Sequence, residues 1–250
     1  MRLFTYKTVL LMALGLLVTV TLPAATIDIS ATANIFSAGG NTPAAPGGFG
    51  AGTTVLAGTW SAFPGRILRF SSVTGLVSCC GGLVPIPYTG PDGGSPVSSG
   101  TDTNINSTGG ISGIQFTGRQ MFLVGVFLDG STPSGPAPAI LSYTNASSQG
   151  ASFSPLIGQT FFIGDGLTGT GSGAVQDFLI PATATRLFLG FADSVGFTGD
   201  AGTYSDNLNH SSSPNGLTAV FAVTGTPEPG TMVLMTLGLV GLAIRRFRRA

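Results

Sequence analysis

The sequence predicts an all-β protein, an antiparallel β-sandwich of the jelly-roll kind, and three observations support this fold class. Apolar runs of strand length recur along the chain, Gly, Pro, Asn or Asp bounds each of them, and Lys and Glu are missing from residues 26–226. Because parallel sheets need crossover helices that this composition disfavours, we expect antiparallel pairing. The runs lie at 26–36, 53–60, 66–73, 111–118, 121–128, 159–164, 175–180, 185–192 and 217–223.

The N-terminal segment, residues 1–25, has the layout of a cleaved secretory signal. Arg2 and Lys7 precede an apolar run at 9–20, and small alanines follow at 24–25, where we expect cleavage. A short hydrophobic helix is expected here, and the alternative is a lasting membrane helix. About twelve apolar residues are, however, fewer than the roughly twenty that span a bilayer. We therefore expect export, with residues 26–226 forming one domain.

The C-terminal segment, residues 227–250, has three parts: a Pro-Glu-Pro triplet, a mostly apolar stretch at 231–244, and a cluster of arginines. A helix over the apolar stretch would be about 21 Å long, shorter than the roughly 30 Å hydrocarbon core. The positive-inside rule would hold the arginines in the cytoplasm and the domain outside. The segment is thus either a lasting anchor or an address that is read and removed. Its signal residues are Pro227, Glu228, Pro229, Arg245, Arg246, Arg248 and Arg249.

The charge of the expected domain differs from that of the whole chain, which is formally neutral. Residues 26–226 contain four arginines and nine aspartates, a net charge of minus five. A nucleic-acid-binding protein would need a basic face. We therefore expect no nucleic-acid partner.

Cys79 and Cys80 are adjacent and are the only cysteines in the chain. In an oxidising compartment they either close a vicinal disulfide or remain thiols. A metal site would need a second pair of ligands that the cysteine count does not supply. We favour the vicinal disulfide.

Catalytic motifs are weak in this sequence, so we do not expect an enzyme. The stretch 164–169, GDGLTG, has the G-x-G-x-x-G spacing, but the residues after it do not open a helix, which favours a turn between strands. His210 is the single histidine, and no G-x-S-x-G elbow accompanies it. No pair of aspartates has a spacing that singles out an acid and a base.

Oxygen-bearing side chains gather after the predicted strand at 185–192. Asp193 follows this strand directly, and Thr203, Asp206 and Asn207 come after a loop that contains glycine. Calcium is a hard cation that accepts about six to eight oxygen ligands from carboxylates, amides and backbone carbonyls. Asp and Asn are also ordinary turn formers, so a turn without metal is the alternative.

The three parts of residues 227–250, in this order and spacing, resemble the PEP-CTERM sorting signal of exported bacterial proteins. The resemblance implies export across an inner membrane, recognition by an exosortase and cleavage near Pro-Glu-Pro. It also implies a transient inner-membrane-tethered intermediate, followed by delivery to the cell surface or the extracellular polysaccharide matrix.

A second resemblance covers residues 120–224. The phrases MFLVGVFLD, GQTFFIGDGLTGTGSG, IPATATRLFLGFADS and GTYSDN are similar to those of a domain common in PEP-CTERM proteins. That domain is itself similar to calcium-dependent galactose-binding bacterial lectins, which have a β-sandwich fold. The resemblance implies that calcium is bound by Asp193, the backbone carbonyl of Thr203, Asp206 and Asn207, and that the ion binds two sugar hydroxyls.

The sequence departs from the lectin pattern in three ways. Extra residues separate Asp193 from the G-T-Y turn, and among them Asp200 could replace it as a ligand. Asp206 stands where the lectins have Asn, which makes the site more negative. The His and Gln that hold sugar in the lectins have no counterpart at 87–95, so we do not expect galactose specificity.

Together these observations predict an exported protein of the cell surface or the polysaccharide matrix, with calcium-dependent carbohydrate binding. The main alternative is a structural matrix protein that binds no ligand. A hydrolase acting on polysaccharide is the least favoured alternative.

Overall fold

The computed structural model describes residues 20–21, 23–40, 52–79, 88–94, 102–193 and 204–225, together with Gly238. Its 3₁₀ turns are η1 (Ile35–Gly40), η2 (Ser147–Gln149) and η3 (Tyr204–Asp206). Its strands are β1 (Val20–Thr21), β2 (Ala25–Ile29), β3 (Val55–Thr59), β4 (Arg66–Gly75), β5 (Val77–Ser78), β6 (Asp102–Ile105), β7 (Ile114–Thr117), β8 (Phe122–Leu128), β9 (Leu141–Tyr143), β10 (Ser152–Phe153), β11 (Thr160–Phe162), β12 (Leu167–Gly169), β13 (Ser172–Val175), β14 (Asp177–Leu179), β15 (Arg186–Ala192), β16 (Leu208–Asn209) and β17 (Leu217–Gly225).

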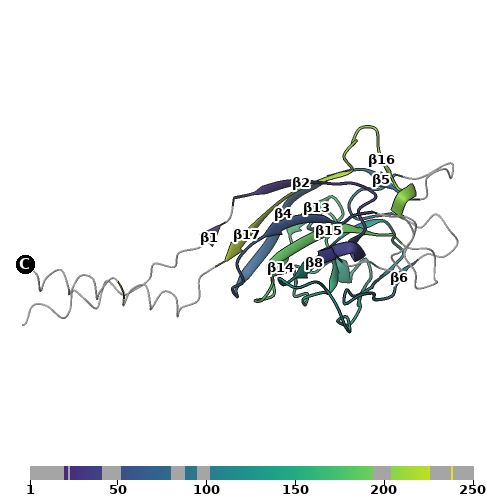
Figure 1. The fold of residues 1–250 in the computed structure, drawn as a ribbon. Coiled ribbons are helices and arrows are strands. Elements are labelled where there is room, and N and C mark those ends of the chain that lie inside the picture. The colour runs from purple at the N-terminus through teal and green to yellow at the C-terminus, as the bar shows by residue number, and fades with distance from the viewer. Residues whose placement is uncertain are drawn as a thin grey trace, which may run out of the picture.

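The larger sheet, here called sheet A, has the order β1-β17-β4-β14-β10, and β2 joins it on β17. Strand β17 pairs with β4 along its whole length, from Leu217↔Gly75 to Gly225↔Arg66, with one register shift. Figure 1 shows β2, β17 and β4 side by side. Side chains alternate between buried and half-buried along β17, as expected where one face of a sheet packs on a core.

The second sheet, sheet B, has the order β11-β8-β15-β3. Its central strands β8 and β15 are antiparallel, with Arg186↔Leu128 at one end and Ala192↔Phe122 at the other. Every residue of β8 is buried, because sheet A packs on one face of sheet B and the small sheet β6-β7-β9 packs on the other. Burial on both faces explains why this strand is a continuous apolar run.

Phenylalanine rings join the two main sheets. The ring of Phe161 on β11 lies 5.4 Å from that of Phe178 on β14, and Phe178 also contacts Phe70, which in turn contacts Phe221. Gly125 of β8 lies opposite Phe161, and a Cβ atom there would come within 2.7 Å of the Phe161 ring. The missing side chain at Gly125 therefore makes room for the ring.

The other face of sheet B packs through a second aromatic group. Phe116 of β7 lies 5.1 Å from Phe122 and 5.2 Å from Phe162, measured between ring centroids, and Tyr143 of β9 closes the group. The small sheet is thus part of the core.

Arg66 begins β4 and is almost fully buried, at 1% exposure. Its guanidinium donates hydrogen bonds to four backbone carbonyls, those of Phe63, Ser61, Pro181 and Ala184. It also lies over the rings of Trp60 and Phe63. Burial lowers the pKa of Arg66. The side chain therefore ties together three segments at the end of sheet A where β17 finishes.

The predicted all-β fold is confirmed, and each of the nine predicted runs contains a strand. Two details differ from the expectation. The run at 26–36 is a strand only to Ile29 and then turns into η1. Two short pairings, β10 with β14 and β7 with β9, are parallel.

Most of 1–25 and of 227–250, where short terminal helices were expected, lies outside the described residues. In the described part of 1–25, Val20–Thr21 is not helical but forms β1, which pairs with β17, and Ala25 begins β2. Gly238 is helical. Within the part of the chain that the structure describes, no helix is long and apolar enough to cross a membrane.

Phe178 and Leu179 are neighbours on β14 that test the packing of the two sheets. Phe178 is fully buried between the sheets, whereas Leu179 is 41% exposed. We expect Phe178→Ala to lower the free energy of unfolding by about 3–5 kcal/mol because it leaves a cavity in the core. Leu179→Ala should change it by less than about 1 kcal/mol. Urea unfolding measures both, and equal losses would contradict this account of the core.

Candidate functional site

Asp193 follows the last residue of β15, a central strand of sheet B, and its side chain is 2% exposed. The pKa of Asp193 is raised to about 7, mainly by burial and to a smaller extent by the charge of Asp206. A hydrogen bond from Asn207 opposes this rise because it stabilises the ionised carboxylate. A buried carboxylate in this state gains strongly from a bound proton or a bound cation.

Tyr204 fixes the position of the turn η3 on the end of β15. Its side chain is fully buried, and its hydroxyl donates to the carbonyl oxygen of Phe191 at 3.0 Å. Burial, reinforced by the charge of Asp193, raises the pKa of Tyr204 well above its ordinary value. The phenol therefore stays neutral and keeps donating, which holds Asp206 and Asn207 near Asp193.

Asn207 is the centre of the hydrogen-bond network at this site. Its Nδ2 atom donates to Asp193 Oδ2 at 3.1 Å and to the carbonyl oxygen of Ala31 at 3.2 Å, and it lies 3.7 Å from Met121 Sδ. These atoms are all acceptors, so a flipped amide would set oxygen against oxygen. The contacts therefore define the orientation of the amide.

The other amide atom, Asn207 Oδ1, is buried and accepts no hydrogen bond. Among the described residues, only Gln176 Oε1 is in the same state. A buried acceptor without a donor is costly, and each such atom needs a physical explanation. The nitrogen of the same amide contacts the buried Asp193 carboxylate, so the two groups that lack compensation belong to neighbouring side chains.

The structure brings together three of the four predicted calcium ligands. Asp193 and Asn207 are in direct contact, and half-buried Asp206 is near enough to act on the pKa of Asp193. Thr203 and the competing Asp200 lie outside the described residues. Within the described ranges there is no cluster of three or more His, Cys, Asp or Glu residues suited to a metal ion; the site has two carboxylates and an amide.

Sequence reasoning missed the residues that support this site. Met121 has a left-handed backbone, with φ of 54°, and its amide donates to the Ala192 carbonyl at 3.0 Å. The Ala31 amide donates to Asn209 Oδ1 at 2.8 Å. These contacts join segments far apart in the chain, and no local pattern marks them. Among the supporting residues, only Tyr204 could have been identified from the sequence, because it belongs to the G-T-Y phrase.

The other residues of interest have structural surroundings or lie outside the described part. Cys79 is buried, and Gln120 Nε2 donates to its sulfur at 3.3 Å. Cys80 lies outside the described residues, so the disulfide between Cys79 and Cys80 stays a prediction.

His210 lies in a loop, where its Nδ1 atom forms a hydrogen bond with Ser212 and its ring packs on Tyr88. The stretch 164–169 begins with the expected turn after β11, with Gly164 and Gly166 at positive φ, and continues as strand β12. The seven sorting residues of the 227–250 segment also lie outside the described part.

The model of the PEP-CTERM protein-sorting motif matches residues 226–249. This match supports an exported protein that an exosortase sorts, through a membrane-anchored intermediate, to the cell surface. No curated protein and no solved structure matches the chain significantly. The resemblance of residues 120–224 to calcium-dependent lectins stays a prediction.

The pKa of Asp193 predicts how stability depends on pH when calcium is removed with a chelator. Its value is about 7 in the folded protein and about 3.9 in an unfolded chain, so the folded state binds more protons between these values. The free energy of unfolding should therefore fall as pH rises from about 4 to 7, by up to about 4 kcal/mol.

Asp193→Asn should abolish this component, because the amide keeps the shape of the side chain and carries no titrating group. Urea unfolding of the wild type and the variant at several pH values measures the difference. Asp28→Asn, which removes an exposed carboxylate from β2, is the control. Identical pH dependence in the wild type and Asp193→Asn would show that Asp193 titrates normally.

Proposed function

We propose that this exported protein holds a calcium ion at the end of β15 and uses it to bind a polysaccharide of the cell surface or the extracellular matrix. The observation that carries the proposal is the oxygen of Asn207, which is buried and has no hydrogen-bond donor, on an amide whose nitrogen contacts the Asp193 carboxylate. The proposed role is binding, not catalysis.

The donor set fits calcium in its chemistry. Asp193 and Asp206 supply carboxylate oxygens, Asn207 supplies an amide oxygen, and the lectin resemblance adds the carbonyl of Thr203. Calcium prefers all three kinds of oxygen and tolerates irregular arrangements of them. The net charge of minus five over residues 26–226 also attracts cations toward the domain.

The chain's own residues prepare the site in two ways. Asn207 uses its amide nitrogen to hold Asp193 and the Ala31 carbonyl, which leaves its oxygen available. Tyr204 anchors the turn that carries Asp206. When bound, calcium would supply open coordination positions at which two neighbouring sugar hydroxyls replace water.

The alternative is a matrix protein in which this site is purely structural, and one observation favours it. The contacts of Asn207 Nδ2 and Tyr204 hold the loop in place without any metal. In that case a neutral, protonated Asp193 would contribute only to the stability of the fold. The two roles differ in their response to calcium.

Melting temperature with calcium and with chelator separates the two roles. A ligand at a hundred times its Kd stabilises the native state by about 2.7 kcal/mol, which in a domain of this size raises Tm by roughly 5–11 °C. We expect this shift in the wild type and in Asp28→Asn, and its loss in Asp206→Ala. An unchanged Tm at millimolar calcium would remove the metal site.

Glycan-array binding tests the sugar step separately. We expect a part of the binding to depend on calcium, and we expect chelator and Asp206→Ala to remove that part. A calcium-dependent Tm shift without any calcium-dependent glycan binding would leave a structural metal and refute the carbohydrate role.

Mass spectrometry of the surface protein tests the sorting step. We expect a C-terminus near Pro227–Pro229 and no peptide that contains Arg245 to Arg249, because the sorting segment is removed. Retention of the arginine cluster in the surface form would identify the segment as a lasting anchor. A Glu228→Ala chain, which loses the only glutamate, should accumulate unprocessed if the triplet is recognised.

A further inference from the structure

A pocket of about 240 Å³ lies at the end of sheet B opposite Asp193. Leu128 ends β8 and borders the pocket, whereas Asp193 lies beyond the other end of the antiparallel pair β8 and β15. The volume is below the roughly 300–1,000 Å³ of clefts for drug-sized ligands. The pocket therefore suits a single small ring.

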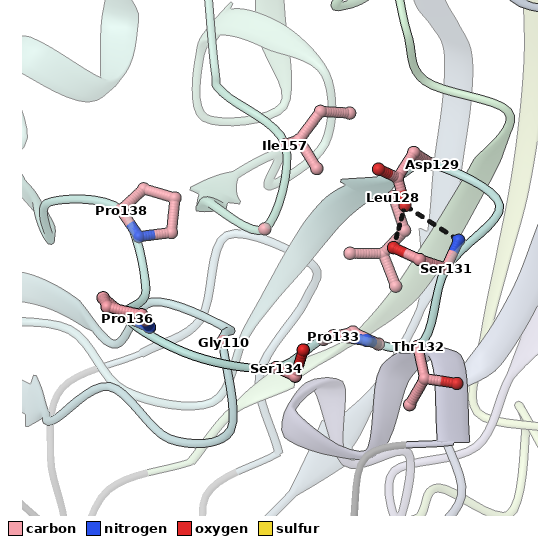
Figure 2. Close-up of a pocket in the computed structure, with 11 residues that line it drawn as sticks. Gly110, Leu128, Asp129, Ser131, Thr132, Pro133, Ser134, Pro136, Pro138 and Ile157 are labelled. Carbon is pink, nitrogen blue, oxygen red and sulfur yellow. Dashed lines mark hydrogen bonds between the residues drawn. The ribbon is translucent and has the colours of Figure 1, made fainter.

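One side of the pocket is polar. Asp129 Oδ1 accepts hydrogen bonds from the amide of Ser131 at 2.9 Å and from its hydroxyl at 2.5 Å. These bonds lower the pKa of Asp129, so the carboxylate stays ionised. Its second oxygen accepts no side-chain or backbone hydrogen bond from another described residue, and Figure 2 shows Asp129 and Ser131 together on this side.

Arg186 balances the charge of this side. Its Nε donates to the carbonyl of Asp129 at 2.7 Å, and Nη2 donates to the carbonyl of Ser131. The guanidinium therefore holds the 129–131 turn and offsets the carboxylate. A charged ligand would gain little net attraction here, so the balance favours an uncharged one.

The opposite side of the pocket is apolar and rigid. Pro136 and Pro138 face Asp129 across the space, with Ile157 between them and the carboxylate side (Figure 2). Proline rings have little freedom to lose when a ligand binds. Apolar proline rings on one side and hydroxyl and carboxylate groups on the other suit a molecule with a C–H face and a rim of hydroxyls.

We propose that this pocket is a second sugar-binding site, independent of calcium, that takes one uncharged pyranose ring. The free oxygen of Asp129 accepts hydrogen bonds from neighbouring hydroxyls of the sugar, and the C–H face of the ring packs on Pro136 and Pro138. This site does not rest on the proposed calcium site. If both exist, one molecule bridges two polysaccharide segments from opposite ends of a rigid sandwich.

Saturation-transfer NMR in chelator tests the pocket. The full-length chain is used in a detergent without a sugar headgroup, with methyl β-galactoside, methyl α-glucoside and methyl α-mannoside as probes. We expect transfer to at least one probe in the wild type, in Asp206→Ala and in Asp28→Asn. Galacturonate and galactosamine, the charged counterparts, should show weaker transfer than the neutral probe.

Two variants alter the pocket without disturbing the core. Asp129→Asn keeps an oxygen for Ser131 but replaces the free acceptor with a donor, and we expect about tenfold weaker binding. Ser134→Phe, at an exposed position on the rim, should block the ring and abolish transfer. No transfer to any probe, or transfer that both variants leave unchanged, would overturn the proposal.

The proposals for the calcium site and for this pocket can be refuted independently of each other. Loss of the calcium-dependent glycan signal alone refutes the proposed function, and loss of the chelator-resistant signal alone refutes the second site.

Discussion

The contact between Phe161 and Phe178 is the interaction on which the arrangement of both ends of the molecule depends. It joins sheet A to sheet B between β14 and the edge strand β11, and it is possible because Gly125 has no side chain to fill the space that the Phe161 ring occupies. Sheet B is then held between sheet A and the small sheet β6-β7-β9. With β8 and β15 fixed in this way, Asp193 and Asp129 are carried at opposite ends of one rigid pair of strands.

The two ends show different ways of presenting a carboxylate. Asp193 is buried, and its surroundings favour the protonated form unless a cation replaces the proton. Asp129 is half-buried, and Ser131 stabilises its ionised form. The first arrangement suits a metal because burial makes an isolated charge costly. The second suits direct contact with hydroxyl groups because the acceptor is already charged and oriented. Location at the cell surface, which the sorting motif supports, would give both proposed sites access to the same polysaccharide.

Much of the fold could be predicted from the sequence, whereas the details of the site could not. The nine apolar runs mark all four strands of sheet B and four of the six strands of sheet A, because burial demands that pattern. The two-residue strands β1 and β10 of sheet A were missed because they are too short to form such a run. Strands such as β13 (Ser172–Val175) were missed because their residues are small and exposed, and the turn at Gly171 and the neighbouring strand decide their pairing. Asp193 could be predicted because it follows a predicted strand. The contacts of Asn207 with Ala31 and Met121 could not, because they form only when distant segments pack together. The Asp129 pocket was missed for the same reason, since its walls come from three separate segments.

The end of β17 also has a mechanical meaning. The chain leaves sheet A at Gly225, which packs against Arg66, so tension on a tethered tail acts along the axis of β17. That strand is antiparallel to β4 over nine paired positions. A load along the strand direction stresses all of these pairings at once, in shear, instead of opening them one after another. The pairing nearest the C-terminal end of β17 is Gly225↔Arg66, and the Arg66 side chain donates hydrogen bonds to four carbonyls of the surrounding loops. A domain held at this end would therefore carry the load on the whole β17–β4 pairing at once.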